Sequence, residues 1–198
     1  MKLDLRFTSR TLEELWCQIV IALVFQGPIE KTGGISGLDA KTSGYLTYLW
    51  KTGFWTGASG DTLLLASQNM IKADKILLKG LGVSSNYSTE IFSKRIKEVG
   101  CNIEGMGIND IGIHIPVIKG FETDFGSQLE SACVNLVDAF FIGHKDDPDF
   151  LLKIVVSIDG SFIGDLTYVV PFLRNDLDSR LDNTIIFDRD RTCTIDNS

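Results

Sequence analysis

Residues 53–82 read GFWTGASGDTLLLASQNMIKADKILLKGLG, and this stretch decides the fold of the chain. A glycine-rich turn leads into an apolar run at residues 61–66, and a second apolar run at residues 75–79 stops at the tripeptide GLG of residues 80–82. Two such runs bounded by turn residues are typical of two adjacent buried strands. The Gly-x-Gly predicts a strand end at which the backbone turns tightly or lets another group approach closely.

Strands and helices alternate on both sides of this block. The expected strands are 2–8, 18–25, 61–66, 75–79, 102–117 (as one long or two short strands) and 151–158. The expected helices are 33–53, 88–99 and 125–141, and one further helix or strand pair follows residue 160. Because the inner strands are apolar throughout, the pattern predicts a three-layer α/β/α sandwich around a mixed, mostly parallel sheet with antiparallel edges.

Length and composition indicate a globular chain. Its 198 residues are 44% hydrophobic and 23% charged, which is enough to build a full core. We expect an α/β domain over residues 1–160 and a C-terminal extension, 161–198, that packs on this domain or on a partner. The net charge of −7 argues against a nucleic-acid partner, which would need a basic face. A nucleotide ligand stays allowed, since a single loop of backbone N–H groups can hold a phosphate.

The cysteines and the N-terminus indicate a cytoplasmic protein without a membrane segment. Four cysteines, Cys17, Cys101, Cys133 and Cys193, are scattered without metal-ligand spacing, so we expect reduced, mostly buried thiols and no metal site. The first ten residues show no signal peptide. The longest apolar stretch, residues 15–25, is only half of a membrane span.

Two glycine-containing loops are the candidate ligand-binding segments. The first follows the second strand of the opening block and contains Gly80, Gly82, Ser84, Ser85 and Asn86. It lacks the third glycine of a dinucleotide fingerprint, so it is either a plain strand-end turn or a ligand-facing loop of another kind. The second contains Gly33 and Gly34 at the start of the first helix, where N–H groups can hold an anion, or where the glycines give a flexible lead-in.

No constellation of residues predicts catalysis. The two histidines, His114 and His144, lie in no metal-binding or nucleophile motif, and we place His114 on the more polar face of its strand. The acidic loop that follows His144 matches no calcium-binding spacing and is expected to be solvated. We therefore assign no catalytic residue, no metal and no cofactor.

The opening block resembles the N-terminal domain of the leucyl aminopeptidase family, peptidase family M17. The resemblance rests on Leu38-Asp39, on the Gly-x-Phe-x-Gly-x-x-Gly turn at residues 53–60 and on the strand that ends in GLG at residues 80–82, and it covers residues 1–142. It implies a macro-domain-like α/β/α fold. In that family the two-metal peptidase site lies in a separate C-terminal domain with an Asn-Thr-Asp-Ala-Glu-Gly-Arg segment, which does not occur in these 198 residues.

Three functional hypotheses follow from the resemblance. The first is a non-catalytic, stand-alone relative of that domain, acting as a regulatory, interaction or assembly module in a homo-oligomer or beside a peptidase subunit. The second is a macro-domain-like binder of ADP-ribose or a related nucleotide that uses residues 33–37 and 80–86. Against it, Gln26-Gly27-Pro28 stands where typical macro domains carry Asn-Ala-Ala-Asn. The third is an enzyme, such as a hydrolase of ADP-ribose derivatives, which no acid–base pair supports.

Overall fold

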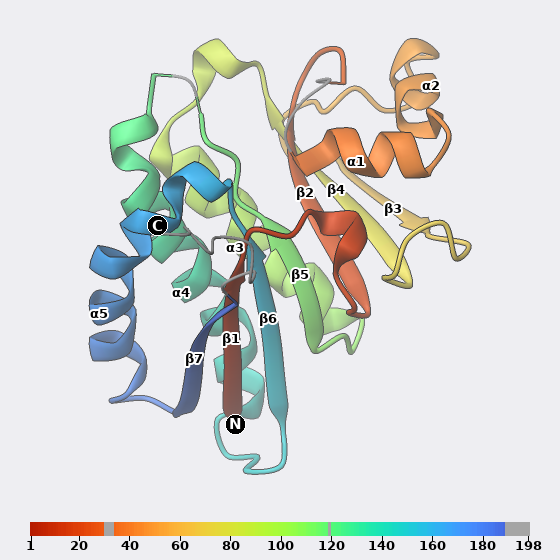
Figure 1. Ribbon diagram of the computed structural model, residues 1–198. Helices are drawn as coiled ribbons and strands as arrows, with labels where there is room; N and C mark the ends of the chain where they lie inside the picture. Colours follow the sequence, from red (N-terminus) through yellow and green to blue (C-terminus); the bar gives the residue numbers. More distant parts are fainter. Residues whose placement is uncertain (30–33, 119, 189–198) are drawn as a thin grey trace, which may run out of the picture.

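The computed structural model describes residues 1–29, 34–118 and 120–188 of the chain. Seven strands form one sheet, in the order β3-β4-β2-β5-β6-β1-β7 (Figure 1). The strands are β1 (Lys2–Thr8), β2 (Ile19–Phe25), β3 (Thr62–Ala66), β4 (Lys75–Gly82), β5 (Asp110–His114), β6 (Leu151–Ser157) and β7 (Asp182–Asp188). The α-helices are α1 (Gly34–Lys41), α2 (Tyr45–Lys51), α3 (Thr89–Gly105), α4 (Phe125–His144) and α5 (Leu166–Leu177).

The sheet is mixed and mostly parallel. Only β3 runs antiparallel to its neighbour β4, while the pairs β2·β4, β2·β5, β5·β6, β1·β6 and β1·β7 are all parallel. Six strands therefore end at one common edge, from which the chain enters its loops and helices. This edge is called the carboxyl edge below.

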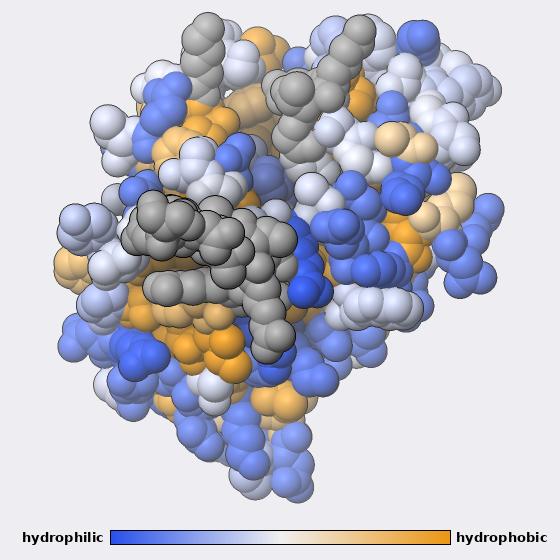
Figure 2. Space-filling model, viewed as in Figure 1, coloured by the Kyte–Doolittle hydropathy of each residue, from blue (hydrophilic) through white to orange (hydrophobic). Residues whose placement is uncertain are grey.

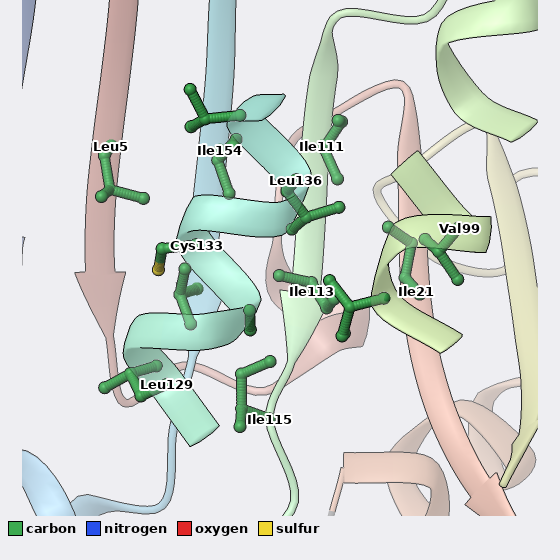
Figure 3. Close-up of a cluster of buried hydrophobic side chains, with 14 of the residues drawn as sticks. Leu5, Ile21, Val99, Ile111, Ile113, Ile115, Leu129, Cys133, Leu136 and Ile154 are labelled. Atoms are coloured by element: carbon green, nitrogen blue, oxygen red, sulfur yellow. The ribbon is translucent and has the colours of Figure 1, made fainter. Parts of the chain in front are cut away.

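Two layers of helices cover the sheet unequally. Helices α3, α4 and α5 pack on one face and enclose the larger core. In Figure 3, Leu129, Cys133 and Leu136 of α4 lie over strand residues such as Ile111 and Ile154. On the other face a smaller core lies beneath α1, α2 and the turn at Leu12–Glu14, over β2, β4 and β3. The described helices leave β1 and β6 open on this face (Figure 1), and Figure 2 shows both hydrophilic and apolar side chains in this region.

The opening block forms two adjacent strands as expected, but two details of the prediction were wrong. Strand β3 lies at the sheet edge and is not buried, since its residues alternate between exposed and half-buried. Strand β4 does not stop before the GLG tripeptide but continues through Gly82. Gly80 is needed because the turn at residues 57–60 crosses it, so that a Cβ on Gly80 would lie 2.8 Å from the carbonyl oxygen of Gly57.

Several expected boundaries shift for identifiable reasons. The helix expected over residues 33–53 is two helices, because Gly44 takes a φ of 76° between α1 and α2. The expected strand over 102–117 is only β5, because Ile103 continues the buried stripe of α3 beyond Val99. Helix α4 reaches His144, three residues past the expected end.

The C-terminal segment contains a helix followed by a strand. Helix α5 packs against α4, and β7 pairs with β1 in parallel register, with Leu5 opposite Ile185. Cys17, Cys101 and Cys133 are free thiols; Cys101 is exposed, while Cys193 lies outside the described residues. In the described ranges no helix is long and apolar enough to cross a membrane, and no cluster of three metal-ligating side chains occurs.

Candidate functional site

Two adjoining cavities follow the carboxyl edge of the sheet. They measure about 650 and 540 Å³ and share four lining residues, Leu23, Ile35, Pro116 and Val117. Because they meet at these residues, we treat them as one site, the carboxyl-edge groove. In open α/β sheets this edge is where ligands bind, because loops from several parallel strands converge there.

The part of the groove nearer β4 has apolar walls and hydroxyl groups at its rim. It is lined by the end of β2, by Gln26-Gly27-Pro28 and by Ser84 and Ser85. Ser84 opens a short 3-10 turn, and the N–H groups of Ser84 and Ser85 donate to no backbone carbonyl among the described residues. The Ser85 hydroxyl donates to Asn86 Oδ1 at 3.4 Å, so this end offers the Ser84 hydroxyl and two backbone donors.

The part nearer β6 carries the titratable groups. His114, Ser157 and Asp159 line it together with Gly34 and Ser36. The parallel register places His114, the last residue of β5, opposite Ser157, the last residue of β6. His114 Nδ1 lies 3.3 Å from Ser157 Oγ, and that hydroxyl donates to the carbonyl oxygen of Arg10 at 2.8 Å.

The imidazole of His114 lies directly against Gly34. A Cβ on Gly34 would lie 2.9 Å from His114 Nε2 and closer still to the ring carbons, so the ring occupies the space that any larger residue would need. Burial lowers the pKa of His114 below its usual range, and a hydrogen bond to the Ser157 backbone and the nearby carboxylate of Asp159 only partly oppose this. The imidazole is therefore neutral at pH 7.

The groove contains one ionised group and no basic side chain among its described lining residues. Asp159 accepts hydrogen bonds from the hydroxyl and the backbone N–H of Ser161, at 2.6 and 2.9 Å, and these bonds lower the pKa of its carboxyl group. A ligand anion in this groove would have to be held by backbone and hydroxyl dipoles.

The candidate residues from the sequence fall into different places. Gly34, Ser84 and Ser85 line the groove, at opposite ends of it. Gly80 and Gly82 lie inside β4 and pack against the turn at residues 57–60, and Asn86 does not line either cavity. Gly33 lies outside the described residues.

Sequence reasoning missed Ser157, Asp159 and Gly27 as groove residues. Ser157 ends an apolar strand, Asp159 follows it by two residues, and a polar residue just after a buried strand is the signal that could have found them. His114, expected on the more polar face of its strand, ends β5 and lines the groove.

A largely buried ion network holds the opening block together and lies outside the groove. Lys79 is only 3% exposed, and its ammonium group donates to Gly60 O at 2.7 Å and Thr62 Oγ1 at 2.9 Å. It also pairs with Glu98 of α3 at 2.8 Å, and Arg95 links the same carboxylate to Ser59. The network joins the glycine turn, β4 and α3.

Comparison with known proteins identifies relatives of this domain. A model of the cytosol aminopeptidase family, N-terminal domain, matches residues 21–141. A probable cytosol aminopeptidase of Oleidesulfovibrio alaskensis is 25% identical over 133 residues, which are 67% of this chain and 26% of that protein. That of Pseudomonas fluorescens is 29% identical over 126 residues, 60% of this chain and 25% of that protein. The chain spans about a quarter of the length of these curated relatives.

Solved structures show the same fold at low sequence identity. A tomato leucine aminopeptidase mutant aligns with a TM-score of 0.60 and 14% identity, over 88% of this chain and 37% of that one. An Oceanobacillus iheyensis macrodomain mutant with ADPR aligns with a TM-score of 0.61 and 9% identity, over 87% of this chain and 92% of that one. The fold is therefore macrodomain-like, and because the family match covers more than half of the chain, the protein belongs to the cytosol aminopeptidase family through its N-terminal domain.

Proposed function

We propose that this domain is a non-catalytic binding module that holds ADP-ribose or a related nucleotide in the carboxyl-edge groove. The observation that carries the proposal is the pair of adjoining cavities at the ends of the parallel strands. Their volumes fall within the roughly 300–1,000 Å³ that is usual for small-molecule sites. The aligned macrodomains include structures whose titles name ADPR and ADP.

The chemistry of the lining matches the parts of such a ligand. Leu23, Ile35 and Val117 form apolar walls at the middle of the groove, where a planar ring can be buried. The N–H groups of Ser84 and Ser85 and the hydroxyl group of Ser84 can hold phosphate oxygens at one end. Acceptors at the other end suit the hydroxyl groups of a sugar.

Ser157 is a poor nucleophile in this geometry, which supports binding rather than hydrolysis. A histidine activates a serine by accepting its hydroxyl proton. Here that proton is donated to Arg10 O, so His114 cannot accept it without breaking a 2.8 Å hydrogen bond. We therefore propose that the domain binds its ligand without hydrolysing it, and that it does so in the cytoplasm.

Isothermal titration calorimetry with ADP-ribose tests the proposal. We expect a dissociation constant below about 100 µM, or roughly 5.5 kcal/mol of binding free energy. Val117→Trp places a large ring where the two cavities meet and should abolish the heat of binding. Ile142→Trp is the matched control, because Ile142 is 84% exposed on α4 and lines neither cavity. Absence of wild-type binding at 100 µM would refute the proposal.

A second candidate role is assembly through the outer surface of α5. Tyr168 and Phe172 are 75% and 64% exposed there, and Phe187 of β7 is also partly exposed. Figure 2 shows an apolar area where β7 and α5 lie in Figure 1. We propose a second copy of this chain as the partner. Light scattering should then give a dimer mass that Tyr168→Ser with Phe172→Ser reduces to a monomer, and a monomeric wild type at 100 µM would exclude this role.

A further inference from the structure

The tautomer of His114 follows from the hydrogen bonds of Ser157. A serine hydroxyl has one proton, and that of Ser157 is donated to Arg10 O. In its contact with His114, Ser157 Oγ must therefore accept, and Nδ1 must carry the proton. Since a neutral imidazole has one N–H, the lone pair of His114 lies on Nε2.

The His114 ring belongs to the wall of the groove nearer β6. In the described part of the chain it contacts both the hydroxyl group and the backbone of Ser157. Gly34 packs against the ring, and the Cβ that it lacks would lie nearer to Cδ2 and Cγ than to Nε2. A neutral imidazole nitrogen that lines a cavity can accept a hydrogen bond from a donor on a bound ligand.

We propose that His114 Nε2 accepts a hydrogen bond from a hydroxyl or amino group of the ligand and so determines which ligands the groove takes. This inference rests on the proposed function, because it names the recognition chemistry of the same groove. His114 touches the ligand directly in this arrangement and acts as a specificity-determining residue.

A second acceptor beside His114 determines the orientation of the ligand in the groove. The carboxylate of Asp159 lines the same cavity, and the hydrogen bonds that the structure gives it go to one oxygen, Oδ1. Two neighbouring acceptors favour a group with two donors, such as the vicinal diol of a ribose, over a phosphate, which is an acceptor at neutral pH. The sugar end of the ligand therefore lies toward β6, and the phosphates lie toward Ser84 and Ser85.

The neutral state of His114 supports this role. Burial lowers its pKa, and Asp159, in the loop after β6, is the charged group that opposes the shift. Ser157 on β6 and Gly34 on α1 face the ring without charge. A protonated ring would present an N–H at Nε2 and could no longer accept from the ligand.

Calorimetry with ADP-ribose at pH 7.5 on two substitutions tests the inference. His114→Asn carries its amide near the position of Nδ1 and leaves nothing at Nε2, whereas His114→Gln extends its amide to the position of Nε2. We expect His114→Asn to bind about tenfold more weakly and His114→Gln to recover most of the affinity. Nitrogen-15 NMR of the wild type should show the Nδ1–H tautomer, with His144→Gln used to assign the two histidine signals.

The outcomes separate this inference from the proposed function. Equal affinity of wild type and His114→Asn, or an Nε2–H tautomer, would overturn the inference and leave the proposed function standing. No binding of ADP-ribose to the wild type at 100 µM would overturn both. The NMR measurement needs no groove variant, so the inference stays falsifiable if His114→Asn fails to fold.

Discussion

Gly80→Ala should destabilise the protein strongly, although it adds a single methyl group to a strand. Gly80 lies in β4 beneath the turn at residues 57–60, and the new Cβ would lie 2.8 Å from Gly57 C and O and closer still to Ala58 O. Ordinary contacts of a Cβ begin at 3.4 Å, so the turn must retreat by more than half an ångström. Gly80 is buried, and no flexible side chain is available to absorb this shift.

The size of the effect follows from the hydrogen bonds that the turn would lose. Gly60 N donates to Gly80 O at 3.0 Å, Gly80 N to Asp61 O at 2.8 Å and Gly82 N to Gly57 O at 3.0 Å. At about 0.5–1.5 kcal/mol each, these bonds give a loss of roughly 2–4 kcal/mol. For a domain of this size that corresponds to a decrease in Tm of about 5–12 °C.

Thermal unfolding followed by circular dichroism checks this value. Gly105→Ala is the matched control, because Gly105 ends α3 with no atom within 4 Å of its added Cβ and without a positive φ. The control should be neutral or slightly stabilising, since alanine restricts the unfolded chain. A Gly80→Ala protein that melts within 1 °C of the wild type would show that the turn moves at almost no cost in free energy, and this would refute the prediction.

Three further predictions concern the buried ion network and the groove. Lys79→Met removes three contacts of a buried ammonium group and should cost about 2–3 kcal/mol in urea unfolding, whereas Lys97→Met, on the exposed face of α3, should cost almost nothing. Burial alone would raise the pKa of Glu98, but hydrogen bonds from Lys79 and Arg95 lower it below its ordinary value of 4.5. The ionised Glu98 therefore stabilises the folded state above pH 4.5, and this stabilisation is lost as the pH falls below that value. Unfolding curves from pH 6 to pH 3 should show this loss in the wild type and much less of it in Glu98→Gln. Gly34→Ala should push the imidazole of His114 into the groove and weaken ADP-ribose binding about tenfold by calorimetry, while Gly164→Ala, in open space, should not.

The sequence predicts the layers of the fold well because burial leaves a periodic pattern. The prediction fails where a segment fits both the two-residue period of a strand and the period of a helix. Met106 and Ile108 are two residues apart, as on one face of a strand, but Val99 and Ile103 are four residues apart and share the buried face of α3. Met106 is 40% exposed, which no strand with that face buried would allow. Without the neighbouring helix α4, the sequence alone gives no reason to choose the longer period.

The groove was only partly predictable, because it is a product of strand register. Gly34, His114 and Ser157 are far apart in the sequence and meet because β5 pairs with β6 and α1 begins above β5. Glycine and serine loops can be read from the sequence, and they identified Ser84, Ser85 and Gly34. Gly80 and Gly82 gave the same signal for a different reason, since their missing side chains make room for the chain's own turn rather than for a ligand.

The charge of the groove restricts what it can hold. Proteins that bind nucleic acids neutralise the phosphates with lysine and arginine, and the release of counterions from the polyanion favours binding. The described lining of the groove has neither, and its one ionised group, Asp159, is negative. Each additional phosphate on a ligand therefore adds repulsion that the dipoles at Ser84 and Ser85 must offset. The affinity has to come from the apolar walls and from donors that reach His114, which favours a diphosphate carrying two sugar rings over a simple polyphosphate.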